Sequence, residues 1–370
     1  MKERFEVLDI FRGIFSSLVV FFHMSAFSAT PIINNNFIYN CDLFVDFFFV
    51  LSGFVITYSY QFLKTSAELS KFYKKRFFRL YPLHLIVLLI FVVIELSKHS
   101  ASGYVHVNRM ADDGNNLTTF ITNIFLLNSV KLPGVHDVSW NIASWSISAE
   151  MIAYLVFGLV ITGINRNNLS KARNIIYLII IAAALGTIYF ITGGFNLMYS
   201  FDYGFLRGLA GFFVGVVCFN TYNYSKAYLK AKKNASFTIL EIVSLSVVIV
   251  FVWYGFVFKP YGFIYEILFF ITIIIFACEK GWLSAQLKKP KFLHSMGKYS
   301  YSIYMIHTLI LSLFNIVFIR MLKLPPSAYA YLFIVNYLII YALSSWTFKH
   351  IEMRFNLSNK PREKKGWWLW

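Results

Sequence analysis

Charged residues are scarce in this sequence: they make up 14% of its 370 residues, whereas hydrophobic residues make up 58%. Soluble domains average about 25% charged residues, so the composition indicates that hydrocarbon, not water, surrounds most of the chain. Long polar segments are also missing, and none between the apolar runs is large enough to form a core of its own. We therefore expect one membrane domain over residues 1–355 and a short basic tail over 356–370.

Acidic residues are half as frequent as basic ones, 17 against 34, which gives a formal net charge of +17. A basic chain can bind nucleic acid, but no basic stretch here belongs to a recognisable soluble module, so no nucleic-acid partner is expected. Cysteine is rarer still. Three thiols on separate apolar runs predict neither a disulfide framework nor a metal site. The histidines and aspartates of segment 98–142 also lack the dense spacing of metal ligands.

Long apolar runs, by contrast, are frequent. A helix that spans a bilayer needs about 20 mostly apolar residues. Ten runs approach that length: 8–28, 41–62, 80–97, 143–165, 174–192, 203–222, 237–257, 262–279, 298–320 and 329–350. The sequence therefore predicts an all-α integral membrane protein with about ten transmembrane helices. The stretch 118–130 is apolar but short, which favours a surface or partly re-entrant helix on the outer side.

Lys and Arg are distributed unevenly over the segments that join these runs. With the N-terminus in the cytoplasm, 26 of the 34 lie in inner segments and six in outer segments, as the positive-inside rule requires. Both termini are then cytoplasmic, and segment 98–142 is external. A cleaved signal peptide is the alternative for the first run, but Asp9, Arg12 and His23 would interrupt its apolar core.

Ionisable side chains inside the predicted spans are expensive and usually functional. Arg12 and His23 are eleven positions apart on one helix, a rotation of ~1100°, so both point the same way, with a rise of ~16 Å between them. Glu150 is roughly 10 Å and His23 roughly 8 Å from the outer ends of their helices. Arg207 lies near the same level, which predicts that the three groups share a depth.

A histidine beside a carboxylate is the minimal apparatus for removing a proton from a hydroxyl, because the carboxylate orients the imidazole and stabilises the imidazolium. The alternative is a buried polar cluster that only holds helices together. Spacing alone leaves both interpretations open.

Five strings carry a family resemblance: LDIFRG at 8–13 with His23, DFFFVLSGF at 46–54, RFFRLYP at 76–82, SWSISAE at 144–150 and KYSYSIYMIH at 298–307. In this order and on these spans they resemble the membrane-bound acyltransferase-3 family, which includes bacterial O-acetyltransferases of surface polysaccharides. The resemblance covers about residues 5–355, and it is to members without a C-terminal SGNH esterase-like domain. The proline that often follows the glutamate equivalent to Glu352 is missing.

The resemblance implies an O-acyltransferase in the bacterial cytoplasmic (inner) membrane. Its donor would be cytoplasmic acyl-CoA, most simply acetyl-CoA, and its acceptor a glycan or lipid-linked glycan reached from the other side, in contact with membrane lipid. No metal is implied. We expect Lys75, Arg76 and Arg79 to hold the donor's phosphates, with Arg12 at the pore mouth, because the guanidinium fork binds phosphate bidentately. The remaining lysines of this segment fit lipid headgroups better: Lys64, Lys71 and Lys74.

With the thioester carried to the depth of His23, we expect His23 to act as the general base, supported by Glu150. Arg207, Trp145 and Ser146 are candidates to stabilise the developing oxyanion. For Arg207 the alternative is an ion pair with Asp202 or another buried acid.

Three more residues complete the candidate substrate-binding set. His307 is either a substrate contact or a helix-packing hydrogen bond. Ser52, with Gly53, permits close approach of helices beside the pore, and Tyr81 also fits the start of a helix at the interface. Two other functions stay open: a transporter with a charged central pathway, although no internal repeat is visible, and a non-catalytic partner in envelope synthesis.

Overall fold

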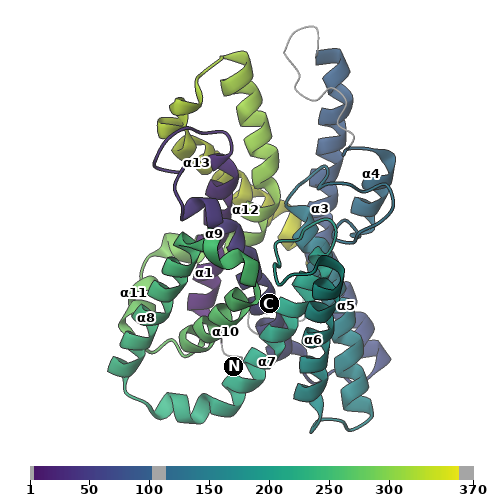
Figure 1. Ribbon diagram of the computed structural model, residues 1–370, viewed down its shortest axis with the longest axis vertical. Helices are drawn as coiled ribbons and strands as arrows, with labels where there is room; N and C mark the ends of the chain where they lie inside the picture. The colour runs from purple at the N-terminus through teal and green to yellow at the C-terminus, as the bar shows by residue number, and fades with distance from the viewer. Residues whose placement is uncertain (1–3, 102–113, 358–370) are drawn as a thin grey trace.

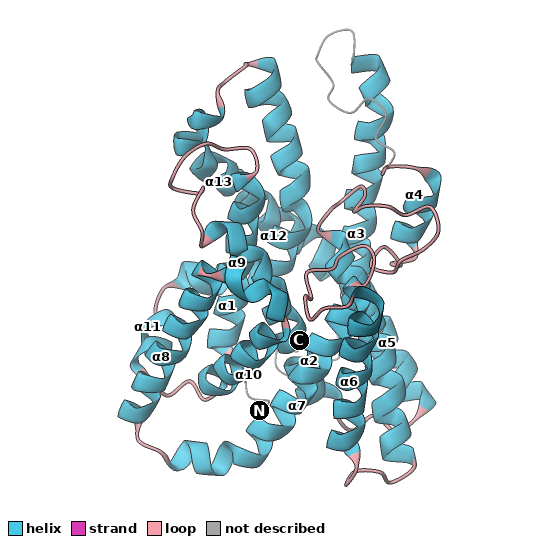
Figure 2. Ribbon diagram, in the orientation of Figure 1, coloured by secondary structure: helices cyan, strands magenta, loops and turns pink. Residues whose placement is uncertain are grey.

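The computed structural model describes residues 4–101 and 114–357. Within them the chain is helical and contains no strand (Figure 2). Nine of these described helices are long and apolar enough to cross a membrane, and a tenth span results if the bent pair Gly255–Tyr261 and Phe263–Ala277 is counted as one. The predicted all-α membrane fold is therefore confirmed. The predicted basic tail lies mostly outside the described residues, as do residues 102–113 of the predicted external segment.

Ten helices coincide with the ten predicted runs: α1 (Glu6–Ser25), α2 (Phe44–Tyr60), α3 (Ser66–Ala101), α5 (Ser144–Arg166), α6 (Arg173–Thr192), α7 (Gly204–Ala231), α8 (Asn234–Trp253), α10 (Phe263–Ala277), α12 (Lys291–Asn315) and α13 (Tyr329–Thr347). Short helices lie between and after them: α4 (Leu117–Ile124), α9 (Gly255–Phe258), α11 (Trp282–Leu287) and α14 (Met353–Phe355). Two π-helical turns, Ile316–Met321 and Phe348–Glu352, extend α12 and α13.

Helix α3 differs most from the prediction, since it begins at Ser66 and not near residue 80. A capping box starts it: the amide of Glu68 donates to the Thr65 hydroxyl, and the amide of Thr65 donates to the Glu68 carboxylate. The basic segment is therefore helical, and the 36 residues extend over about 54 Å, well beyond a bilayer core of ~30 Å. Arg76 and Arg79 consequently lie on a rigid element.

The connecting segments gather at two opposite ends of the bundle. At the first, which we call the basic end, Arg166 donates to the Lys64 carbonyl, and Lys280 donates to the Lys232 carbonyl. At the second, the far end, the Lys131 amide donates to the Asp202 carbonyl. Every pair joins two predicted inner segments or two predicted outer ones. These three contacts agree with the alternation that ten crossings require, and the assignment of the basic end to the cytoplasm stays a prediction.

Two glycines bring α1 and α12 into backbone contact. A Cβ atom on Gly13 would lie 2.4 Å from the Gly297 nitrogen, and one on Gly297 would lie 2.4 Å from the Asp9 carbonyl oxygen. The two helices run in parallel from the basic end, side by side in the centre of the molecule (Figure 1). Residues equally far from these glycines on the two helices therefore lie level with each other.

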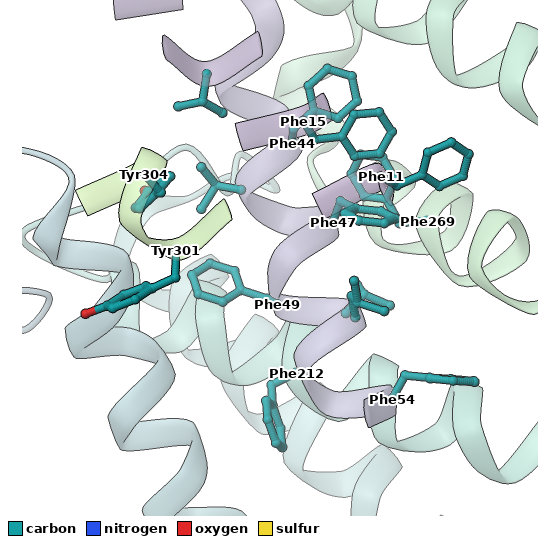
Figure 3. Packing of buried hydrophobic residues seen from close by; sticks show 14 of the residues in the cluster. Phe11, Phe15, Phe44, Phe47, Phe49, Phe54, Phe212, Phe269, Tyr301 and Tyr304 are labelled. Carbon is teal, nitrogen blue, oxygen red and sulfur yellow. The ribbon is translucent and has the colours of Figure 1, made fainter. Parts of the chain in front are cut away.

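Helix α2 packs on both sides. Gly53 lies against the Phe212 carbonyl of α7, as predicted for close helix approach, because a Cβ there would be 1.9 Å from that oxygen. On the side toward α1 and α10, phenylalanine rings interlock: Phe11, Phe15, Phe44, Phe47 and Phe269 (Figure 3). Tyr301 and Tyr304 of α12 lie on the other side of α2 (Figure 3), where a cavity opens.

The segment 114–143 descends alongside α3 and reaches into the bundle. Asn115 donates to the Glu95 carboxylate, and the Asn123 carbonyl oxygen lies 2.9 Å from Nε2 of His84, eleven residues nearer the basic end. Further on, Asn141 donates to the Met305 carbonyl of α12. This path fits the partly re-entrant alternative for 118–130. It also means that α5 begins inside the bundle.

Candidate active site

A cavity lies between α1, α2, α3, α5 and α12. Its lining combines apolar side chains, such as Phe48 and Ile147, with charged and hydroxyl groups. Six predicted site residues contribute to it: Arg12, Ser52, Arg76, Arg79, Ser146 and Glu150. Residues 138 positions apart in sequence, from Arg12 to Glu150, thus share one space.

Three arginines make the cavity cationic on one side. Arg76 and Arg79, three residues apart on α3, project from the same helix face. Arg76 is buried and donates to the Tyr60 hydroxyl at 3.2 Å. Arg12 has Asp9 at 3.9 Å, whereas Arg79 makes no hydrogen bond or ion pair within the described chain. Unpaired guanidinium donors on a cavity wall are suited to an anion.

Glu150 is the acid of this cavity. Its carboxylate accepts the Ser52 hydroxyl at 2.6 Å and, in a short hydrogen bond, the hydroxyl of Tyr154. Ser52 and Tyr154 are also 3.0 Å apart. Tyr154 follows Glu150 by four residues, so both side chains project from the same face of α5. One carboxylate thereby orders two hydroxyls opposite the arginines.

Glu150 does not contact His23, which differs from the sequence expectation. Because Asn141 is level with Met305, α5 begins near the level of His307, and Glu150 lies six residues, or about 9 Å, further toward the basic end. It lines the same cavity as the arginines, between the level of Arg12 and that of His23. The predicted depths of Glu150 and His23 were both counted from the outer ends of their helices. Those ends are not level, because residues 125–143 pack inside the bundle.

The nearest ring to His23, apart from its chain neighbour, belongs to His307, with ring centroids 5.0 Å apart. This follows from the packing of α1 on α12, since His23 is ten residues beyond Gly13 and His307 ten residues beyond Gly297. His307 is buried, and its Nδ1 lies 2.6 Å from the Tyr304 carbonyl oxygen. Its Nε2 has no hydrogen-bond partner among the described residues.

Tyr304 connects the cavity with this pair of histidines. It lines the cavity, and its ring centroid is 5.8 Å from that of His307. Its hydroxyl accepts a hydrogen bond from Ser146 at 2.9 Å, which leaves its own O–H available to donate. Along α1, the distance from Arg12 to His23 is ~16 Å, and neither His23 nor His307 is among the residues that line the cavity.

Arg207 is engaged elsewhere. Its guanidinium donates bidentately to Asp46, at 2.7 and 2.8 Å, and both groups are buried. The guanidinium carbon also lies 5.3 Å from the Trp145 ring centroid. Arg207 and Trp145 are absent from the cavity lining. The ion-pair alternative therefore describes Arg207, and its acid is Asp46, not Asp202.

Lys75 and Tyr81 are absent from the cavity lining. Lys75 lies in a separate surface depression with Lys71 and Lys74. Tyr81 stacks on Phe77 with ring centroids 4.4 Å apart. The structure thus separates the lysine from the two arginines with which the sequence grouped it.

A family model described as an acyltransferase domain matches residues 5–345. The chain belongs to the acyltransferase-3 family. It is also similar to Acyltransferase MdmB of Streptomyces mycarofaciens, with 29% identity over 117 residues, which are 31% of this chain and 27% of that protein. The match thus spans about a quarter of the relative's length. No solved structure is significantly similar.

The expected family is confirmed, and the protein is a multi-pass membrane member of it. Three residues of the site region were not predicted from the sequence. Tyr154 could have been found from its i+4 spacing to Glu150, and Asp46 as an acid within an apolar run. Tyr304 carried no such signal, because tyrosine is common on these helices.

Proposed function

We propose that this acyltransferase moves an acyl group, most simply acetyl, from cytoplasmic acyl-CoA to a hydroxyl of a surface glycan or its lipid-linked precursor. One observation supports this most: a cavity with an unpaired arginine is lined by Tyr304, whose ring lies next to buried His307 and so close to the partly buried His23, ~16 Å from Arg12 along α1. The basic end would then face the cytoplasm of a bacterial inner membrane, in agreement with the distribution of Lys and Arg.

The donor's anionic nucleotide end would stay at the basic end, held by Arg76 and Arg79 with Arg12 beside them. Arg79 has donors to spare, and the apolar lining around Phe48 suits the uncharged pantetheine arm. An extended arm is about as long as the rise from Arg12 to His23. The thioester would therefore pass Tyr304 and reach the histidines.

In the transfer, His23 takes the proton of the acceptor hydroxyl while its oxygen attacks the thioester carbonyl carbon. A C–O bond forms and the C–S bond breaks. The CoA sulfur then receives the proton from the His23 imidazolium, so acceptor ester and CoA thiol leave with all atoms accounted for. The Tyr304 hydroxyl, held by Ser146, is the donor nearest to this region and would stabilise the oxyanion.

Glu150 would serve the donor and not the base. Its carboxylate orders Ser52 and Tyr154 on the wall opposite Arg76 and Arg79, so it shapes the space through which the donor passes. Glu150→Gln should therefore raise the KM for acyl-CoA more than it lowers kcat, whereas His23→Gln should do the reverse. If both variants lower kcat equally, Glu150 supports His23 as the sequence suggested, and the role in donor binding is wrong.

The test of the function uses purified protein, acetyl-CoA and surface glycan extracted from a strain that lacks this protein. Acceptor-dependent release of CoA, with acetyl found on the glycan, is expected. A transporter or a non-catalytic partner would release none. The acyl chain is tested in the same assay, since longer acyl-CoA donors that react faster than acetyl-CoA would overturn the choice of acetyl.

A further inference from the structure

His307 presents a buried hydrogen-bond acceptor that its own helix does not use. Its Nδ1 lies 2.6 Å from the Tyr304 carbonyl oxygen, three residues earlier in α12. A carbonyl oxygen can only accept, so Nδ1 carries the hydrogen, and in the neutral ring Nε2 keeps a lone pair. That nitrogen is buried without a partner among the described residues, although unpaired buried polar atoms are unfavourable.

His23 is the polar side chain that can supply the missing hydrogen. Its ring centroid is 5.0 Å from that of His307, and the ring planes are tilted by 41°. The two rings are not hydrogen-bonded to each other in the structure. However, the χ2 torsion of histidine is broad, and catalytic hydrogen bonds often shorten only when substrate binds. A rotation of the neutral His23 ring can therefore direct its single N–H at Nε2.

The helix packing holds the two rings level. Gly13 and Gly297 allow backbone contact between α1 and α12, and each histidine lies ten residues beyond its glycine. Parallel helices of equal rise therefore carry His23 and His307 to the same height, ~15 Å above the contact. The carboxylate of Glu150, in contrast, is about 9 Å nearer the basic end and is bonded to Ser52 and Tyr154.

We propose that His307 is the positioning residue of His23: its Nε2 accepts a hydrogen bond from one ring nitrogen of His23 and so leaves the other nitrogen free to take the acceptor's proton. A carboxylate has this role in catalytic triads, where it fixes the tautomer of the base. The inference rests on the proposed function. The proton still moves from the acceptor hydroxyl to His23 and on to the CoA sulfur, and none stays on His307.

The first measurement compares kcat and KM for acetyl-CoA in the parent protein and in His307→Phe, which keeps a ring but removes the acceptor. We expect kcat to fall at least tenfold, and by no more than the roughly 10²–10⁴-fold that a positioned general base contributes. The KM for acetyl-CoA should be unchanged, since the arginines are not touched. His307→Gln, whose amide oxygen can accept from His23, should recover part of the lost kcat.

His84 offers a matched control. It is also fully buried, with Nε2 2.9 Å from a backbone carbonyl and Nδ1 unpaired, but it lies on α3 and contacts Asn123. His84→Phe thus reports what the loss of a buried imidazole does to stability. Its folded fraction should keep the parental kcat. If it loses kcat as His307→Phe does, the effect is structural and the proposal is wrong.

A double-mutant cycle tests whether His307 acts through His23. If it does, substitution of His307 has no further effect on kcat in a protein that already lacks His23. In the His23→Gln background, His307→Phe should leave the residual rate unchanged. An equal further loss would overturn the proposal. If His307→Phe does not accumulate, the same cycle is run with His307→Leu, which also removes the acceptor. Parental kcat in His307→Phe with a defective His23→Gln refutes this inference alone, whereas parental kcat in both refutes the catalytic role of His23.

Discussion

The contact between α1 and α12 gives a prediction of stability and activity together. A Cβ on Gly13 would lie 2.4 Å from the Gly297 nitrogen and the Met296 carbonyl carbon, whereas ordinary contacts begin at 3.4 Å. Gly13→Ala must therefore separate the two backbones by about 1 Å, because neither backbone atom can rotate away. Such overpacking costs typically about 1–3 kcal/mol, and the helix propensity of alanine returns up to about 1 kcal/mol. We expect a net loss of stability.

The assay is thermal unfolding of the purified protein in detergent, followed by tryptophan fluorescence. Gly163→Ala is the matched control, since Gly163 lies inside α5 with nothing within 4 Å of the added Cβ, and it should unfold at a higher temperature than the parent. Gly13→Ala should unfold at a lower one. It should also lose acyl transfer, because the same separation moves His23 from His307. Equal rises in unfolding temperature for the two variants would refute the tight packing.

Three further predictions concern charge. Arg79→Gln should weaken acetyl-CoA binding by about ten- to a hundredfold through lost charge-assisted hydrogen bonds, measured by calorimetry, and an equal effect of Lys75→Gln would indicate a diffuse basic surface instead. Asp46→Asn should destabilise the fold by about 3–5 kcal/mol in denaturant titrations because it leaves a buried guanidinium unpaired, whereas Asp42→Asn, in a partly exposed pair, should cost about 1 kcal/mol or less. A cysteine within 223–236 of a Cys-free variant should resist an impermeant maleimide in intact cells, and labelling there would contradict the ten-span topology.

The number and order of the spans could be predicted because apolar run length alone determines whether a segment can cross a bilayer. The start of α3 could not, since it depends on the capping box of Thr65 and Glu68 and not on hydropathy. The break near Gly262 lies where the predicted runs 237–257 and 262–279 are separated, but the 100° angle between Gly255–Tyr261 and Phe263–Ala277 could not be predicted from hydropathy.

The candidate site was predictable within one helix and not between helices. Rotation and rise along α1 correctly place Arg12 and His23 on one face, and the three-residue spacing places Arg76 and Arg79 together. The offset between two helices, however, comes from tertiary packing. That offset puts Glu150 in the cavity with Arg12, about 9 Å nearer the basic end than His23.

The proximity of His23 and His307, in contrast, has a signal in the sequence. Both histidines follow a glycine by ten residues on helices that start at the same end, and glycines in membrane helices often mark close contacts. Two equal spacings on parallel helices therefore carry a signal of juxtaposition. The bidentate pair of Arg207 and Asp46, 161 residues apart, had no comparable pattern.

The central claim is that His23 transfers the proton while a distant arginine wall holds the donor. His23→Gln tests it most directly, because glutamine keeps a helix-packing hydrogen bond but cannot act as a base at neutral pH. We expect His23→Gln to fold, insert into the membrane and bind acetyl-CoA with parental affinity. It should acylate the glycan roughly 10²–10⁴-fold more slowly. Acylation at the parental rate would show that His23 is structural and would contradict the mechanism.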